Sequence, residues 1–180
     1  MIVRPAAAGD AGEVAAIANR LVRDTLVTFT TRARTVQEVA DQIAERGPAF
    51  LVCEIGGAVA GYATHGAFRA GPGYARTCEH SLAVTEDARG RGAGRALMTR
   101  LMRVAADAGL HVMVAGISGA NPGAVAFHAA LGFAEVGRMP QVGRKNGRWL
   151  DLILMQKILD PGPGPDSGPD SGADFPRPGG

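Results

Sequence analysis

The chain has little cysteine, few aromatic residues and no long apolar run, and each scarcity excludes a class of protein. Its two cysteines, Cys53 and Cys78, show no metal-ligand spacing, so we expect buried free thiols in a reducing compartment and no metal site. No stretch approaches the ~18 apolar residues that a membrane span needs. The N-terminus lacks a charged-then-apolar leader. We therefore expect a cytoplasmic protein with no membrane partner.

Charge is also limited, which bears on the partners that the chain can bind. Charged residues make up 20% of the sequence, aromatic residues 5%, and the formal net charge is +2. Residues 160–180 hold four aspartates and one arginine, a net charge of −3, so residues 1–159 carry +5. This excess is too small, and aromatic residues are too scarce, for a nucleic-acid surface. It suits an anionic small ligand instead.

Composition divides the chain into two parts. Residues 1–159 are long enough for one well-buried core and predict a single domain. Of the 21 residues in 160–180, twelve are proline or glycine, and Pro-Asp-Ser-Gly occurs twice in tandem. Such a segment buries too little apolar surface to offset the entropy of ordering it. We expect a disordered tail there.

Apolar periodicity predicts an α/β protein with its elements in the order β-α-α-β-β-β-α-β-α-β-β. Paired glycines between two apolar runs indicate a hairpin, and the almost unbroken apolar run 110–117 is typical of a strand covered on both faces. The expected strands are 2–4, 49–55, 58–68, 77–84, 110–117, 133–139 and 149–157, with a polar loop at 141–148.

Capping patterns place the starts of the helices. Asp10 and Glu13 form one D-x-x-E box, and Thr35 and Glu38 form a second box of the same kind. Residues 25–34 break the helical period between the two helices and predict an irregular loop. A third helix is expected over 95–108, and a fourth begins after Asn121 as N-cap.

A glycine- and arginine-rich loop joins the strand 77–84 to the helix after it. Its glycines let the backbone turn tightly and approach a ligand, and the helix start offers free N–H groups at the positive end of the helix dipole. This arrangement favours phosphate, most simply a pyrophosphate. Expected ligand contacts are Leu82, Ala83, Val84, Arg89, Gly90, Arg91, Gly92, Ala93, Gly94, Arg95 and Ala96, with Asn121 as helix cap, ligand contact or both.

Two common nucleotide motifs do not fit this loop. No lysine follows the last glycine, as a P-loop requires, and position 95 is arginine where the dinucleotide fingerprint needs glycine. A glycine-rich connector without a ligand stays open as the alternative. What residues 89–94 do resemble is R/Q-G-x-G-x-G/A, the acetyl-CoA loop of the GNAT superfamily of N-acetyltransferases.

Further segments resemble one group within that superfamily, the phosphinothricin and methionine sulfone/sulfoximine acetyltransferases. The segment 74–84 is similar to the group's Y/F-x-x-T-x-E-H-S-x-x-V, and the segments 109–115, 121–133 and 139–151 resemble the same group. The resemblance implies the GNAT fold with a central mixed sheet flanked by helices, acetyl-CoA as co-substrate, a small amino acid acetylated on its α-amine, and a homodimer. It also implies that Asn121 caps its helix, binds the pantetheine arm, or does both. Departures are Leu82-Ala83 in place of Val-Tyr, Ala124 in place of serine, Asn146 in place of an aromatic residue, and Arg76 one place later than the usual arginine.

The chemistry needs a base, an oxyanion donor and a proton for the leaving thiolate, but no protein nucleophile. Glu79 is the candidate base, since a carboxylate in an apolar strand is costly to bury without a partner and burial raises its pKa toward working pH. A structural ion pair with an arginine is the alternative; the resemblance favours catalysis. A strand N–H near Leu82 or Val84 is expected to hold the oxyanion. His128 stands where many relatives place the tyrosine acid, or it serves as a structural neighbour.

By the same resemblance, Phe29, Tyr74, Arg76, Thr77 and Lys145 line the acceptor cleft. His65, His80 and His111 lie in strands and are interpreted as structural. Two other functions stay open: acetylation of another amine, such as a polyamine or a protein N-terminus, and a catalytically silent acyl-CoA sensor. A polyamine site needs acidic residues around the cleft, and few are available besides Glu79.

Overall fold

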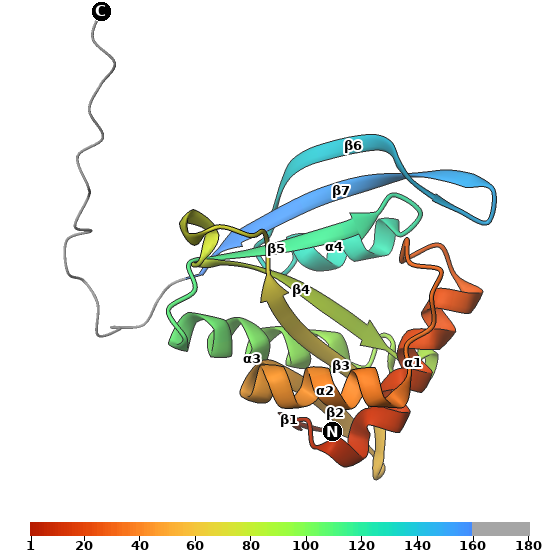
Figure 1. Cartoon of the computed structure of the whole chain (residues 1–180), viewed down its shortest axis with the longest axis vertical. Helices are drawn as coiled ribbons and strands as arrows, with labels where there is room; N and C mark the ends of the chain where they lie inside the picture. Colours follow the sequence, from red (N-terminus) through yellow and green to blue (C-terminus); the bar gives the residue numbers. More distant parts are fainter. Residues whose placement is uncertain (160–180) are drawn as a thin grey trace, which may run out of the picture.

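The computed structural model describes residues 1–159, in which one mixed sheet of seven strands takes the order β1-β2-β3-β4-β5-β7-β6. The predicted α/β class and element order are confirmed (Figure 1). The predicted tail, 160–180, lies outside the described residues. The elements are β1 (Ile2–Pro5), α1 (Ala11–Asp24), α2 (Val36–Arg46), β2 (Phe50–Ile55), β3 (Ala58–Ala67), β4 (Thr77–Val84), α3 (Ala93–Asp107), β5 (Val112–Ser118), α4 (Pro122–Ala129), β6 (Ala134–Lys145) and β7 (Arg148–Ile158).

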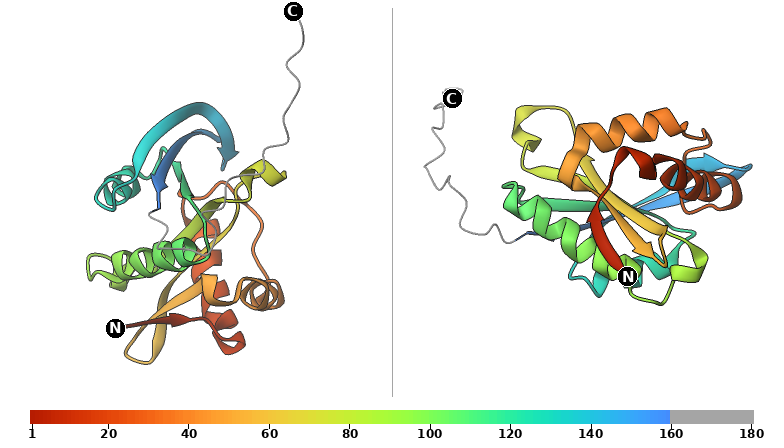
Figure 2. Two further views of the ribbon diagram at one scale, coloured as in Figure 1. Left: turned by 90° about the vertical axis from the view of Figure 1, so that its left-hand side faces the viewer. Right: turned by 90° about the horizontal axis from the view of Figure 1, so that it is seen from below.

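Helices cover both faces of the sheet because the strands are apolar on both sides. In β2 the side chains of Phe50 and Val52 pack with α1 and α2, while those of Leu51 and Cys53 pack with α3. This is the alternation that a strand imposes on its side chains. Figure 2 shows α1 and α2 on one side of the sheet and α3 on the other.

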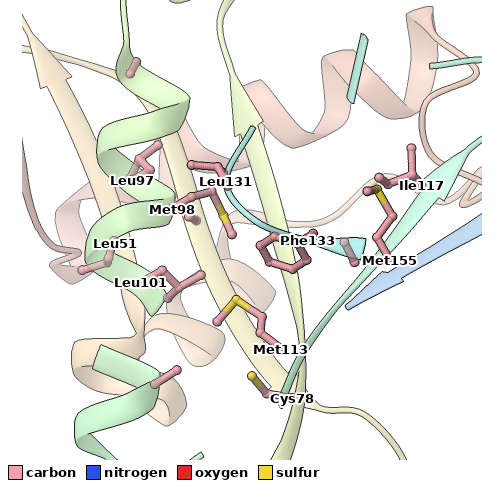
Figure 3. Packing of buried hydrophobic residues seen from close by; sticks show 14 of the residues in the cluster. Leu51, Cys78, Leu97, Met98, Leu101, Met113, Ile117, Leu131, Phe133 and Met155 are labelled. Atoms are coloured by element: carbon pink, nitrogen blue, oxygen red, sulfur yellow. The ribbon is translucent and has the colours of Figure 1, made fainter. Parts of the chain in front are cut away.

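The core between the sheet and α3 is the larger of the two. Leu97, Met98 and Leu101 from α3 are fully buried and reach Met113 on β5 and Phe133 before β6 (Figure 3). Burying a side chain of this size contributes about 1.5–3 kcal/mol to the free energy of unfolding. This packing fixes α3, and therefore the loop before it, against β4 and β5. Both cysteines are buried and free, as expected.

The two central strands separate partway along their length. Parallel pairing between β4 and β5 covers only Thr77–Glu79 against Val112–Val114. Beyond that point β4 stays paired with β3 as far as Val84, and β5 stays paired with β7 as far as Ser118. The strands diverge toward their C-terminal ends (Figure 1), which opens a gap in the middle of the sheet.

The first capping prediction was wrong, although α1 itself is present. The N-cap Asp10 makes no cap bond to α1. Its carboxylate accepts hydrogen bonds from the Arg4 guanidinium at 2.7 and 2.9 Å and from the Ala7 N–H at 2.8 Å. These three bonds use both oxygens of the carboxylate, which bonds the guanidinium and an N–H before the helix in place of the amides of α1. The second box is confirmed, with Thr35 and Glu38 bonded to each other's backbone N–H.

Two boundaries also differ from the sequence prediction. The helix α3 begins at Ala93 rather than Arg95, so the glycine-rich loop ends at Gly92. The expected loop 141–148 belongs mostly to the strands of a long hairpin, whose turn is Asn146-Gly147. Both turn residues have positive φ, at 50° and 76°, as a tight hairpin turn between twisted strands requires. Polarity misled the prediction because this hairpin is largely exposed.

Candidate active site

A cavity of about 780 Å³ occupies the gap between β4 and β5. Its walls come from both strands, the loop before α3, the start of α4 and the segment between α1 and α2. This volume is in the range of sites that hold small molecules. The predicted site residues that line it are Glu79, Leu82, Ala83, Val84, Arg89, Gly90, Gly92, Ala93, Gly94, Arg95, Asn121 and His128.

The separation of the strands directs two backbone donors into this cavity. Directly after β4, Thr85 N–H donates to Ala60 O at 2.9 Å, and at the start of β4 Thr77 O accepts from Phe68 N–H at 3.4 Å. Because hydrogen-bonding directions alternate along an antiparallel pair, the N–H groups of Leu82 and Val84 point away from β3. They face the side on which the register with β5 has already ended. Both donors are therefore available to a ligand oxygen.

The loop before α3 ends in a helix N-terminus without a side-chain cap in the described chain. Gly92 is the N-cap in the left-handed region, with φ of 85°, which only glycine adopts without strain. The first-turn amides that follow have no partner inside the helix. Arg89 and Arg95 line the cavity beside them, whereas Arg91 and Ala96 do not. This end of the cavity fits an anion such as a pyrophosphate.

Glu79 lies deeper in the gap, at the last residue pair of β4 and β5. Its carboxylate lies over Gly116 of β5, where an added Cβ would come within 2.9 Å of Oε1. Among residues 1–159 no cationic side chain forms an ion pair with Glu79. The alternative role, a structural ion pair with an arginine, therefore has no support in this part of the chain. The side chain is exposed to the gap, not buried in the strand as the sequence suggested, and partial desolvation there raises the pKa of its carboxyl. Glu79 therefore has the setting of a proton acceptor.

His128, on α4, is held at both ring nitrogens. Its Nδ1 lies 2.7 Å from Ala124 O, and its Nε2 lies 3.1 Å from Nε2 of His80. A carbonyl only accepts, so His128 Nδ1 carries the proton and its Nε2 accepts from His80. The two rings stack with centroids 5.0 Å apart. Burial lowers the pKa of His80 to about 3, so this ring is neutral at ordinary pH.

Asn121 keeps its capping role at the start of α4. Its Oδ1 accepts from Ala124 N–H at 3.3 Å, and its own N–H donates to Ser118 O at 2.8 Å. The side chain also borders the cavity. Capping and ligand contact are therefore compatible at this position.

The five expected acceptor residues do not line this cavity. Phe29 packs over Gly143 on β6, and Lys145 donates from Nζ to Thr28 O at 2.9 Å, which ties the segment between α1 and α2 to β6. Tyr74 is exposed, Arg76 accepts at its carbonyl from His111 and Val112, and Thr77 begins β4. All three lie at the end of β4 opposite the glycine-rich loop.

Several polar residues of the cavity were not predicted as site residues, among them His80 and Arg34. His80 was interpreted as structural, yet it contacts His128, and its place in Glu79-His80-Ser81 was the available signal. Arg34 lines the cavity from the irregular segment between α1 and α2, where no motif marks it. No group of three or more metal-ligating side chains occurs within 1–159. No helix there is long and apolar enough to cross a membrane.

This geometry, a helix N-terminus and a gap between diverging strands, agrees with the comparisons with known proteins. The acetyltransferase (GNAT) family model matches residues 15–133. The L-amino acid N-acyltransferase MnaT of Escherichia coli is 49% identical over 117 residues, 65% of this chain and 68% of that protein. An L-methionine sulfoximine/L-methionine sulfone acetyltransferase of Salmonella typhimurium is 40% identical over 172 residues, 93% of this chain and 99% of the relative.

Solved structures agree with the sequence relatives. A GNAT superfamily phosphinothricin acetyltransferase from Sinorhizobium meliloti, solved in complex with acetyl-CoA, superposes with a TM-score of 0.84 at 34% identity, covering 95% of this chain and 94% of the other. The chain belongs to the acetyltransferase (GNAT) family, and its predicted GNAT fold is confirmed. Within the family it is an N-acetyltransferase close in sequence to the methionine sulfoximine and phosphinothricin acetyltransferases.

Proposed function

We propose that the protein transfers the acetyl group of acetyl-CoA to the α-amine of a small amino acid resembling methionine sulfone, methionine sulfoximine or phosphinothricin. The observation that carries this proposal is one cavity with an anion-binding helix N-terminus at one end and Glu79 at the other. The printed names of the relatives support the substrate class. We further propose that residues 1–159 form the catalytic domain and that the buried free thiols belong to a cytoplasmic protein.

We assign the binding of acetyl-CoA to cavity residues that contact its pyrophosphate and its pantetheine arm. The amides after Gly92, with Arg89 and Arg95, hold the pyrophosphate, and the pantetheine arm lies along the backbone of Leu82 to Val84, in the place where β5 no longer pairs with β4. We include Arg91 and Ala96 as flanking contacts and Asn121 at the pantetheine. When bound, acetyl-CoA supplies an acetyl group activated as a thioester.

Proton transfer is assigned to Glu79. Its carboxylate accepts a proton from the substrate ammonium, directly or through water, which frees the nitrogen lone pair. The nitrogen then forms the new C–N bond and loses its second proton as the C–S bond breaks, and the departing thiolate takes up a proton. The N–H of Leu82 or Val84 stabilises the intermediate oxyanion because a fixed donor pays no reorganisation cost in the transition state.

His128 is the proposed donor of the proton that the thiolate takes. Ala124 O holds the Nδ1 proton, Nε2 accepts from His80, and burial lowers the pKa of the His128 ring. His128 therefore acts as an acid only after its Nε2 takes up a proton during the reaction. The change His128→Asn keeps a donor for Ala124 O and removes this acid. We expect kcat to fall roughly 100-fold, in the range of general acid catalysis, with KM for acetyl-CoA little changed. Steady-state rates test this; an unchanged kcat would make His128 a structural residue.

Release of CoA from acetyl-CoA in the presence of candidate acceptors tests the proposed function. Methionine sulfone, methionine sulfoximine and phosphinothricin should be acetylated faster than spermidine or a short peptide with a free N-terminus. Preference for spermidine or the peptide would favour the other amine substrates. Protection of the fold by acetyl-CoA against heat, without turnover of any acceptor, would favour a sensor.

We also propose a homodimer through the hairpin of β6 and β7. This hairpin exposes Val136, Met139, Val142 and Trp149, each about half accessible, and such grouped apolar side chains on one exposed hairpin mark an interaction surface. Light scattering should give twice the chain mass for the wild type and one chain mass for Trp149→Ser. Val36→Ser removes an equally exposed side chain from α2 and should leave the dimer intact. A monomeric wild type would contradict the assignment.

A further inference from the structure

Arg34 is fixed in the cavity wall by three hydrogen bonds. Its backbone N–H donates to Asn19 Oδ1 and its carbonyl accepts from Asn19 Nδ2, both at 2.8 Å. Its Nη1 donates to Gln42 Oε1 on α2 at 3.0 Å. The two helices thus hold the backbone and the side chain of a residue in an otherwise irregular segment. The guanidinium is positioned before any ligand arrives.

The charge of this guanidinium has no counter-ion within the described chain. Neighbouring arginines differ, since Arg20 pairs with Glu86 and Arg32 pairs with Glu38. Arg34 instead faces a cavity and meets the neutral amide oxygen of Gln42. One of its five N–H groups is used by that bond, which leaves most of the donor fork for a ligand.

Arg34 and Glu79 lie on the same side of the sheet. Ala83 packs in the cluster formed with α1 and α2, and Glu79, four residues earlier on the same strand, points to the same face. Arg34 comes from the segment that joins those two helices. Tyr62 lies beside it: burial raises the pKa of this phenol, and the nearby charge of Arg34 opposes the rise.

The charged side chains that line the cavity fall into two groups with different proposed ligands. Arg89 and Arg95 flank the helix N-terminus and face the proposed pyrophosphate site. That leaves Arg34 and Glu79 as the charged pair on the acceptor side. One cation and one anion on the same face match a zwitterion, whose ammonium and carboxylate are attached to one carbon.

We propose that Arg34 binds the α-carboxylate of the acceptor and thereby directs the α-amine toward Glu79. The inference rests on the proposed function and makes it more specific: the substrate is recognised as an α-amino acid, not merely as an amine. A guanidinium suits this task because its planar fork donates two parallel hydrogen bonds to a carboxylate. The same positive charge disfavours polyamines, which are cationic throughout.

The experiment compares methionine sulfone with its decarboxylated analogue, methylsulfonylpropylamine, as acceptors. The measured quantity is the ratio of kcat/KM for the amino acid to kcat/KM for the amine. In Arg34→Gln this ratio should fall roughly 10- to 100-fold, as expected for the loss of a charge-assisted contact. Arg34→Lys should recover part of the loss. Arg32→Gln removes a neighbouring arginine that does not line the cavity and should leave the ratio at its wild-type value.

An unchanged ratio in Arg34→Gln, with an active wild type, would overturn the role of Arg34 and leave the proposed function standing. A wild type that acetylates the amine as well as the amino acid would overturn it too. If the wild type turns over neither acceptor, the proposed function fails. Calorimetric binding of methionine sulfone to the CoA-loaded protein then decides: binding weakened at least 10-fold by Arg34→Gln supports the contact, and equal or absent binding overturns it.

Discussion

Glu79→Gln should lower kcat/KM for methionine sulfone by roughly 100- to 10,000-fold at neutral pH, the range that general base catalysis contributes. The amide has nearly the shape of the carboxylate, so the contact with Gly116 is kept while the proton acceptor is lost. Because burial raises the pKa of Glu79, the wild-type rate should fall with decreasing pH through a pKa above the usual glutamate value. Below that pKa the carboxyl is protonated and cannot accept a proton. Steady-state CoA release across pH measures both effects.

Glu45→Gln is the matched control, since Glu45 is an exposed carboxylate on α2 that does not line the cavity. Its rates should equal those of the wild type. The binding constant for acetyl-CoA should also be unchanged in Glu79→Gln. If Glu79→Gln retains wild-type turnover, Glu79 is not the base and the rate is set by another group.

Gly92→Val should weaken acetyl-CoA binding by roughly 100-fold, which corresponds to about 3 kcal/mol. Gly92 has φ of 85°, and a β-branched residue there is strained. Relief of that strain tilts the first turn of α3 and moves its amides away from the pyrophosphate. The loss of one or two hydrogen bonds to a charged group accounts for the magnitude, at about 1.5–3 kcal/mol each. Calorimetric titration with acetyl-CoA measures it.

Gly57→Val provides the control for the strain itself. Gly57 also has φ of 85°, and at both glycines an added Cβ meets nothing within 4 Å. Gly57 lies in the turn between β2 and β3, outside the cavity lining. Both variants should lose similar amounts of thermal stability, whereas only Gly92→Val should lose affinity. Equal affinity in the two variants would place the cofactor phosphates elsewhere.

Patterns that depend on local chemistry predicted most of the fold. The capping box of Thr35 and Glu38 is present because both side chains are free to bond the helix start. The corresponding box at Asp10 is absent because the carboxylate binds Arg4, which lies on β1 six residues earlier in the chain. Asn146-Gly147 is a strong hairpin signal, but the sequence predicts a polar loop there because the strands around it are exposed and therefore polar.

Some residues of the site could likewise be predicted from local patterns in the sequence, and others could not. The glycine-rich loop follows from residue types and spacing along one strand–loop–helix unit, whereas Glu79 as the base depends also on the family resemblance; both line the cavity. The contact between His80 and His128 joins residues 48 positions apart, on a strand and on a helix. Arg34 enters the cavity only because Asn19 and Gln42 hold it there. Contacts of this kind depend on tertiary packing, which no local pattern encodes.

Acetyl-CoA carrying an isotope label in its acetyl group tests the central claim most directly. The purified protein is mixed with this compound and methionine sulfone, and the small molecules and the intact protein are then analysed by mass spectrometry. We predict labelled N-acetyl methionine sulfone, with the acetyl group on the α-nitrogen, one CoA released for each product and no label on the protein. Label attached to the protein as an intermediate, or the absence of N-acetylated amino acid while CoA is released, would contradict direct transfer to the α-amine.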